Sequence, residues 1–157
     1  NKYDKMYLFN VNINTKETHR KSDTFQAGSN IVLLNIDKIK IGFTICYDLR
    51  FPNLFRQLAK RGAQIILMPA AFTVPSGKAH WEVMLRSRAI ENSLFVVATG
   101  MCGKHHTNRK TYGHSLLVNP WGKIISKAKE KPKILNTNFN LNEIEHVRNK
   151  IPAILND

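Results

Sequence analysis

The chain has 157 residues, 43% of them hydrophobic, and its 24 Lys and Arg against 11 Asp and Glu give a formal net charge of +13. This length and apolar content fit one globular domain with a core, and they exclude a disordered chain. No apolar run approaches the roughly 18–20 residues that a membrane-spanning helix requires, so the sequence predicts no transmembrane segment and no membrane partner.

The first third of the chain predicts β-structure. Met6–Val11 is expected to be a strand, and the polar stretch Asn12–Asn30 a loop. Two apolar runs, Ile31–Ile36 and Ile39–Cys46, are separated by Asp37-Lys38, which predicts a hairpin. In the second run the apolar residues alternate, so one face is expected to be buried; these residues are Ile39, Ile41, Phe43 and Ile45.

The middle of the chain alternates between predicted helices and strands. A helix over Pro52–Arg61 has its apolar residues on one face, and the apolar strand Gln64–Pro69 follows it. A second helix is predicted over His80–Asn92 and a second buried strand over Leu94–Thr99. This order predicts an α/β layered fold.

Hairpins dominate the last third. Ser115–Asn119 and Lys123–Lys127 flank a turn that contains Pro and Gly. Ile134–Phe139 is predicted to be a further strand, and Asn140 and Glu143 form a capping-box pattern that predicts the start of a helix.

The charge and the two cysteines restrict the function classes. The basic residues are scattered and no recognition module accompanies them, so a lysine-rich composition is favoured over a nucleic-acid partner, although a basic nucleic-acid binder remains an alternative. Cys46 and Cys102 cannot form a disulfide framework, which favours a reduced, cytoplasmic setting. His105 and His106 are adjacent and lack further ligands at metal-binding spacing, so no metal site is predicted.

Cys46 is singled out by its position. It ends a predicted buried strand, directly before a turn that leads into a helix. That placement exposes a side chain above a sheet, where backbone N–H groups favour a thiolate nucleophile. A free cysteine is also commonly a small buried hydrophobe, and position alone leaves both readings open.

A series of segments, in order along the chain, resembles the carbon–nitrogen hydrolases, also called the nitrilase superfamily. The segments are Gly42–Pro52, Pro69–Phe72, Gly77–Glu82, Arg86–Asn92, Tyr112–Ser115 and Asn119–Gly122, with Tyr3–Phe9 similar to the segment that carries the family's lysine. Within the superfamily the similarity is closest to the deaminated-glutathione amidase and omega-amidase branch. The resemblance implies an α/β fold, a partial α-β-β-α sandwich of the nitrilase type, in which residues 1–157 form a carbon–nitrogen hydrolase domain whose N-terminal portion is missing. It also implies a homo-oligomer or association through an exposed sheet.

The resemblance implies an amidase that hydrolyses a linear amide of a small carboxylated molecule through a cysteine thioester, without a cofactor or metal. Cys46 is then the nucleophile, Lys5 the catalytic lysine, and Tyr47 and Phe72 the oxyanion- and substrate-binding residues. For Lys5, the residues alone would indicate a solvated surface lysine.

Two departures from the family pattern concern activity. The family's general-base glutamate lies upstream of the lysine, in a portion that this chain lacks, and Lys21 stands where a supporting glutamate is usual. A catalytically inactive remnant or a partner-dependent fragment is therefore the alternative function. A further alternative is a Cys–His hydrolase that pairs Cys46 with His80 or His114.

Overall fold

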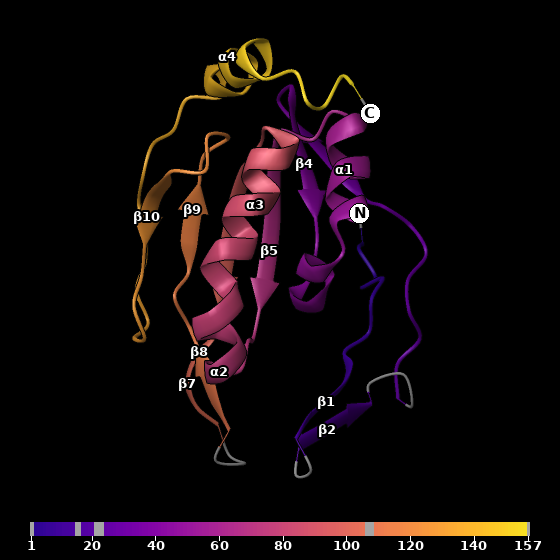
Figure 1. Cartoon of the computed structure of the whole chain (residues 1–157), viewed down its shortest axis with the longest axis vertical. Coiled ribbons are helices and arrows are strands. Elements are labelled where there is room, and N and C mark those ends of the chain that lie inside the picture. The colour runs from indigo at the N-terminus through magenta and orange to yellow at the C-terminus, as the bar shows by residue number, and fades with distance from the viewer. Residues whose placement is uncertain (1, 15–16, 21–23, 106–108, 157) are drawn as a thin grey trace.

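A six-stranded mixed sheet forms the centre of the protein in this computed structural model, which describes residues 2–14, 17–20, 24–105 and 109–156 (Figure 1). The strand order is β10-β9-β6-β5-β4-β3. The strands are β3 (Leu33–Ile36), β4 (Ile39–Phe43), β5 (Ile65–Ala70), β6 (Phe95–Gly100), β9 (Leu116–Val118) and β10 (Ile124–Lys127). The central strands β4, β5 and β6 are parallel, and the outer pairs are antiparallel. Their carboxyl ends therefore meet at one edge of the sheet.

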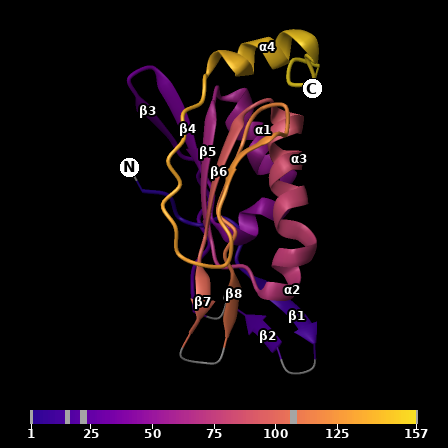
Figure 2. The same ribbon diagram turned by 90° about the vertical axis from the view of Figure 1, so that its left-hand side faces the viewer.

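Helices cover one face of this sheet (Figure 2). They are α1 (Pro52–Lys60) and a continuous helical segment made of α2 (Val74–Ser76), a π-helical turn (Gly77–Trp81) and α3 (Glu82–Asn92). In α1 the four buried residues are three and four positions apart, as the sequence pattern predicted. The second helical segment begins six residues earlier than the predicted His80 because Val74–Trp81 is also helical.

The opposite face of the sheet is apolar and only partly covered. One face of this run is buried, as predicted, but it is the face of Gly42 and Thr44, whereas Ile39 and Ile41 are only half-buried. The reason is that the helix layer packs on the other side, where a Cβ on Gly42 would lie 2.9 Å from Leu58. The chain between β10 and α4 (Asn142–Lys150) crosses the isoleucine side (Figure 2).

The N-terminal segment differs from its prediction. The first strand is β1 (Asn10–Asn14), not Met6–Val11, and it pairs with β2 (Glu17–Arg20) inside the predicted loop. Residues 5–9 form no strand, because the backbone N–H of Tyr7 donates to the Asp48 carboxylate instead of to a neighbouring strand.

In the last third of the chain, one predicted hairpin is present, one hairpin was not predicted, and one predicted strand is not formed. Strands β9 and β10 flank the predicted turn, and the hairpin β7 (Cys102–Lys104) and β8 (Lys110–Tyr112) was not predicted. Ile134–Phe139 is not a strand, and Ile134 is 91% exposed. Asn140 accepts the N–H of Asn142, but Glu143 binds the Asn119 side chain, so the capping box does not form.

Among the helices of the described part of the chain, none combines the length and apolar character needed to cross a membrane.

Candidate active site

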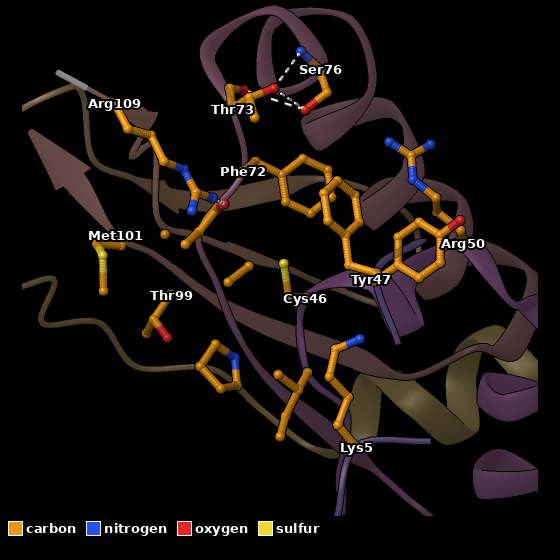
Figure 3. Close-up of a pocket in the computed structure, with 16 residues that line it drawn as sticks. Lys5, Cys46, Tyr47, Arg50, Phe72, Thr73, Ser76, Thr99, Met101 and Arg109 are labelled. Carbon is orange, nitrogen blue, oxygen red and sulfur yellow. Dashed lines mark hydrogen bonds between the residues drawn. The ribbon is translucent and has the colours of Figure 1, made fainter. Parts of the chain in front are cut away.

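A cavity of about 630 Å³ lies at the carboxyl ends of the three parallel strands. Cys46 follows β4, Pro69 and Ala70 end β5, and Thr99 and Gly100 end β6. Open α/β sheets bind their ligands at this edge, because loops there converge above the strand ends. The remaining lining residues are Lys5, Phe9, Ile45, Tyr47, Arg50, Ala71, Phe72, Thr73, Ser76, Met101 and Arg109 (Figure 3).

Cys46 has a backbone conformation that is rare for a residue with a side chain. Its φ is +51°, in the left-handed region, and it begins a 3-10 helix (Cys46–Arg50). The first hydrogen bond of this helix runs from the Asp48 N–H to the Ile45 carbonyl at 3.1 Å. As the second residue of the helix, Tyr47 has an N–H with no intrahelical acceptor. The turn thus places a half-buried thiol beside a backbone donor at the cavity wall.

Asp48 connects this turn to the N-terminal segment. Its carboxylate is fully buried and accepts the Ile45 N–H at 2.7 Å, the Tyr3 hydroxyl at 2.8 Å and the Tyr7 N–H at 3.1 Å. Burial, followed by the hydrogen bond to Asp48, raises the pKa of the Tyr3 hydroxyl, which therefore stays protonated as a donor. These bonds hold residues on both sides of Lys5 against the cysteine turn.

Lys5 lies at the same cavity as Cys46 (Figure 3). Its Nζ donates a hydrogen bond to the Tyr7 carbonyl and lies 5.4 Å from the centroid of the Tyr47 ring. The backbone carbonyl of Lys5 accepts the Gly28 N–H at 2.9 Å. The structure therefore brings together Lys5, Cys46 and Tyr47, which the sequence named as candidates.

Two further cations line the cavity. The Arg50 guanidinium lies 5.9 Å from the Tyr47 ring centroid and 5.8 Å from that of Phe72. Arg109, from the β7–β8 hairpin, reaches the Ala71 carbonyl at 3.2 Å. With Lys5 these side chains make every charged group among the described lining residues positive.

The fourth candidate, Phe72, is buried and forms one wall of the cavity. Its ring meets Trp81 edge-on at 4.9 Å, and the Trp81 indole N–H donates to the His114 carbonyl at 2.8 Å. Phe72 is therefore fixed by packing rather than free to rotate into the cavity.

The histidines proposed as partners of Cys46 do not line its cavity. His80 Nδ1 lies 3.2 Å from the Arg50 side chain, and His114 Nδ1 lies 2.6 Å from the Tyr112 carbonyl. Of the adjacent pair, His105 forms a hydrogen bond with Thr111.

The remaining residues are Lys21, His106, Glu82 and Glu91, none of which the family pattern makes the general base. Lys21 and His106 fall outside the described residues. Glu82 pairs with Lys127 and Glu91 with Arg88, and neither carboxylate lines the cavity. Within the described lining residues there is thus no carboxylate to act as a general base.

The sequence reasoning missed Asp48, Arg50 and Arg109. Asp48 and Arg50 lie two and four residues after Cys46, so their closeness to the thiol was available as a signal. Arg109 comes from a hairpin that the sequence did not predict, and nothing in its local pattern marks it as a cavity residue.

Comparison with known proteins identifies the family. A model of the carbon-nitrogen hydrolase family matches residues 1–149, and the chain therefore belongs to the carbon-nitrogen hydrolase family. It is 41% identical over 156 residues to the deaminated glutathione amidase of Yersinia enterocolitica, and 39% identical over 155 residues to that of Synechocystis sp. (strain PCC 6803 / GT-S). The alignments cover 98% of this chain and 54% and 57% of those proteins.

The fold is similar to that of solved nitrilase-superfamily proteins. The crystal structure of the C. elegans NitFhit protein superposes with a TM-score of 0.90 at 36% identity, covering 99% of this chain and 38% of that one. The α/β sandwich of the nitrilase type is thereby confirmed. The chain spans about half the length of the curated relatives. The family model matches from residue 1 onward, and this match does not support the expectation of a missing N-terminal portion.

Proposed function

We propose that this chain carries the nucleophile and the lysine of an amidase that cleaves a linear carbon–nitrogen bond in a small carboxylated amide. The observation that carries the proposal is the convergence of Cys46 and Lys5 on one cavity at the carboxyl ends of the parallel strands. The named activity of the relatives makes deaminated glutathione the first substrate to test.

The proposed reaction has two stages. The Cys46 thiolate attacks the amide carbon, and the Tyr47 N–H and the Lys5 ammonium stabilise the resulting oxyanion. The carbon–nitrogen bond then breaks, ammonia leaves after taking up a proton, and a thioester remains on Cys46. Water attacks the thioester, releases the acid and returns the proton to the thiol.

These proton transfers require an acid–base group that the described lining residues do not provide. A glutamate from another segment would accept the thiol proton, donate it to ammonia and later activate water. A positioned group of this kind contributes about 10²–10⁴-fold to the rate. We therefore propose that the chain acts with a glutamate-bearing segment, and that alone it is impaired or is an inactive, partner-dependent fragment.

The charge of the cavity supports an anionic substrate. Lys5, Arg50 and Arg109 line it, and no carboxylate among the described lining residues opposes them. Arg50 and Arg109 would bind carboxylate groups while the aromatic wall holds the carbon chain. A cytoplasmic setting, and a homo-oligomer or association through an exposed sheet, belong to the same proposal.

Ammonia release from deaminated glutathione, measured with and without a glutamate-bearing segment of a related amidase supplied in trans or by fusion, tests the proposal. We expect turnover only in the supplemented sample and its loss in Cys46→Ala, whereas the matched control Cys102→Ala keeps it. Turnover by the chain alone would overturn the requirement for the segment. Turnover by supplemented Cys46→Ala would overturn the nucleophile.

A further inference from the structure

We infer that Tyr3 and Asp48 are positioning residues that hold Lys5 against Cys46. The inference rests on the proposed function, since it concerns how the lysine of that site is aimed. It assigns a role to two side chains that do not line the cavity themselves.

The carboxylate of Asp48 accepts hydrogen bonds from both the cysteine turn and the N-terminal segment that carries Lys5. One bond goes to the N–H of Ile45, the residue before the nucleophile, at 2.7 Å. The other two go to Tyr3 and Tyr7, at 2.8 and 3.1 Å, which lie two residues before and two residues after Lys5. Residues on both sides of Lys5 are therefore hydrogen-bonded to the same carboxylate, which restricts where Lys5 can lie.

Other contacts fix the same segment without touching the thiol. The Tyr7 ring stacks on Phe51 with centroids 3.5 Å apart, and Gly28 donates to the Lys5 carbonyl. A Cβ on Gly28 would lie 2.2 Å from the Asp4 carbonyl oxygen, so the approach of residues 4 and 28 requires glycine. Because this segment is not part of a strand, these individual bonds decide where Lys5 lies.

Asp48 also has a local role, which must be separated from the positioning role. Its bond to Ile45 spans three residues and caps the 3-10 helix, so an Asp48 variant would disturb the cysteine turn itself. The bond to Tyr3 spans 45 residues and has no capping function. Tyr3→Phe removes the hydroxyl, with its bonds to Asp48 and to the Met6 backbone, and leaves the cap in place, which makes it the informative variant.

The test measures the rate at which iodoacetamide alkylates Cys46, with Cys102 in the same molecule as the reference, by mass spectrometry of the 157-residue chain. Four proteins form a double-mutant cycle: wild type, Lys5→Met, Tyr3→Phe and the double variant. Lys5→Met is expected to slow Cys46 about tenfold at neutral pH, because an ammonium nearby favours the reactive thiolate. Tyr3→Phe is expected to slow it about threefold, with no further slowing in the Lys5→Met background.

Tyr112→Phe is the matched control, since it removes a tyrosine hydroxyl outside the cavity and is expected to leave the alkylation rate of Cys46 unchanged; because Tyr112 lies opposite Cys102 in the β7–β8 hairpin, the absolute rate of Cys46 is compared for this variant. The pH–rate profile of Cys46 should also move to higher pH in Tyr3→Phe, a shift that a purely structural role would not produce. If Tyr3→Phe slows the alkylation of Cys46 equally in the wild-type and Lys5→Met backgrounds, or does not slow it at all, the positioning role is overturned. The proposed function is unaffected by that result. An unchanged rate in Lys5→Met would overturn both.

Discussion

The guanidinium of Arg88 on α3 donates two hydrogen bonds to the backbone carbonyl of Leu49, at 3.0 Å from Nε and 2.8 Å from Nη2. Leu49 belongs to the 3-10 helix that begins at Cys46, and both Arg88 and Leu49 are buried. The same guanidinium pairs with Glu91 at 2.8 Å and lies over the Phe55 ring. The helix layer therefore holds the cysteine turn at Leu49, while Asp48 ties that turn to the N-terminal segment.

Arg88→Met is predicted to destabilise the protein and to loosen the cysteine turn. It leaves the Leu49 carbonyl buried without its donors, which costs about 1–3 kcal/mol. Urea denaturation measures the loss in the free energy of unfolding. Arg86→Met is the matched control, because exposed Arg86 makes a single bond to the Gly122 carbonyl and should change stability by no more than about 0.5 kcal/mol. Equal losses in the two variants would contradict the role of Arg88.

The cations of the cavity predict a preference for anionic reagents at Cys46. Iodoacetate and iodoacetamide differ mainly in charge, so the ratio of their rates at Cys46 reports the field in the cavity. Arg109→Gln should lower the ratio of the iodoacetate rate to the iodoacetamide rate about two- to fivefold, which is the effect expected for the loss of one partly exposed positive charge. High salt should reduce the difference in this ratio between the wild type and Arg109→Gln, because salt screens the charge of Arg109.

Lys104→Gln provides the control for this measurement. Lys104 is exposed on the same hairpin but does not line the cavity, so its removal should leave the ratio unchanged. Equal ratios for wild type and Arg109→Gln would show that Arg109 does not act on charges at Cys46.

The Tyr3 hydroxyl predicts a loss of stability at alkaline pH. Burial and then the bond to Asp48 raise its pKa above the ordinary value near 10, so the folded state keeps a proton that the unfolded state releases. The stabilisation is fully present below pH 10 and is lost as the pH rises above it. Tyr3→Phe should therefore show a shallower decline in unfolding free energy above pH 10 than the wild type. Parallel declines would contradict this linkage.

The partly covered isoleucine face of the sheet predicts self-association with a second copy. Ile41 and Val97 lie on this face and are half-buried, and apolar faces of this kind favour association. Light scattering should give a mass above that of the 18.0 kDa chain, and Ile41→Lys should lower it. The control is Val83→Lys on the exposed side of α3, which should not change the mass. A monodisperse wild-type monomer would contradict the prediction.

Elements with a strong local period were predictable from the sequence. The apolar spacing within α1 and the apolar runs of β5 and β6 located these elements to within a residue, because such segments bury the faces that their own patterns define. The strand predicted over Ile39–Cys46 ends three residues early, at Phe43, because Cys46 already begins the 3-10 helix; the placement of Cys46 just after this strand followed from the same reasoning. The strand predicted over Ile134–Phe139 failed because an apolar pattern forms a strand only where a partner offers hydrogen bonds.

What the sequence determined by itself was the order of helices and strands from β3 to β6, the family, and Cys46, Lys5, Tyr47 and Phe72 as candidates. The tertiary structure alone decided that the Tyr7 N–H bonds to Asp48, 41 residues away, so that the segment around Lys5 is an anchored loop and not a strand. It also decided that Arg109 reaches the cavity. The physical reason is that periodicity records which faces of a segment are buried, whereas the partner of a hydrogen bond or the wall of a cavity depends on how distant segments pack.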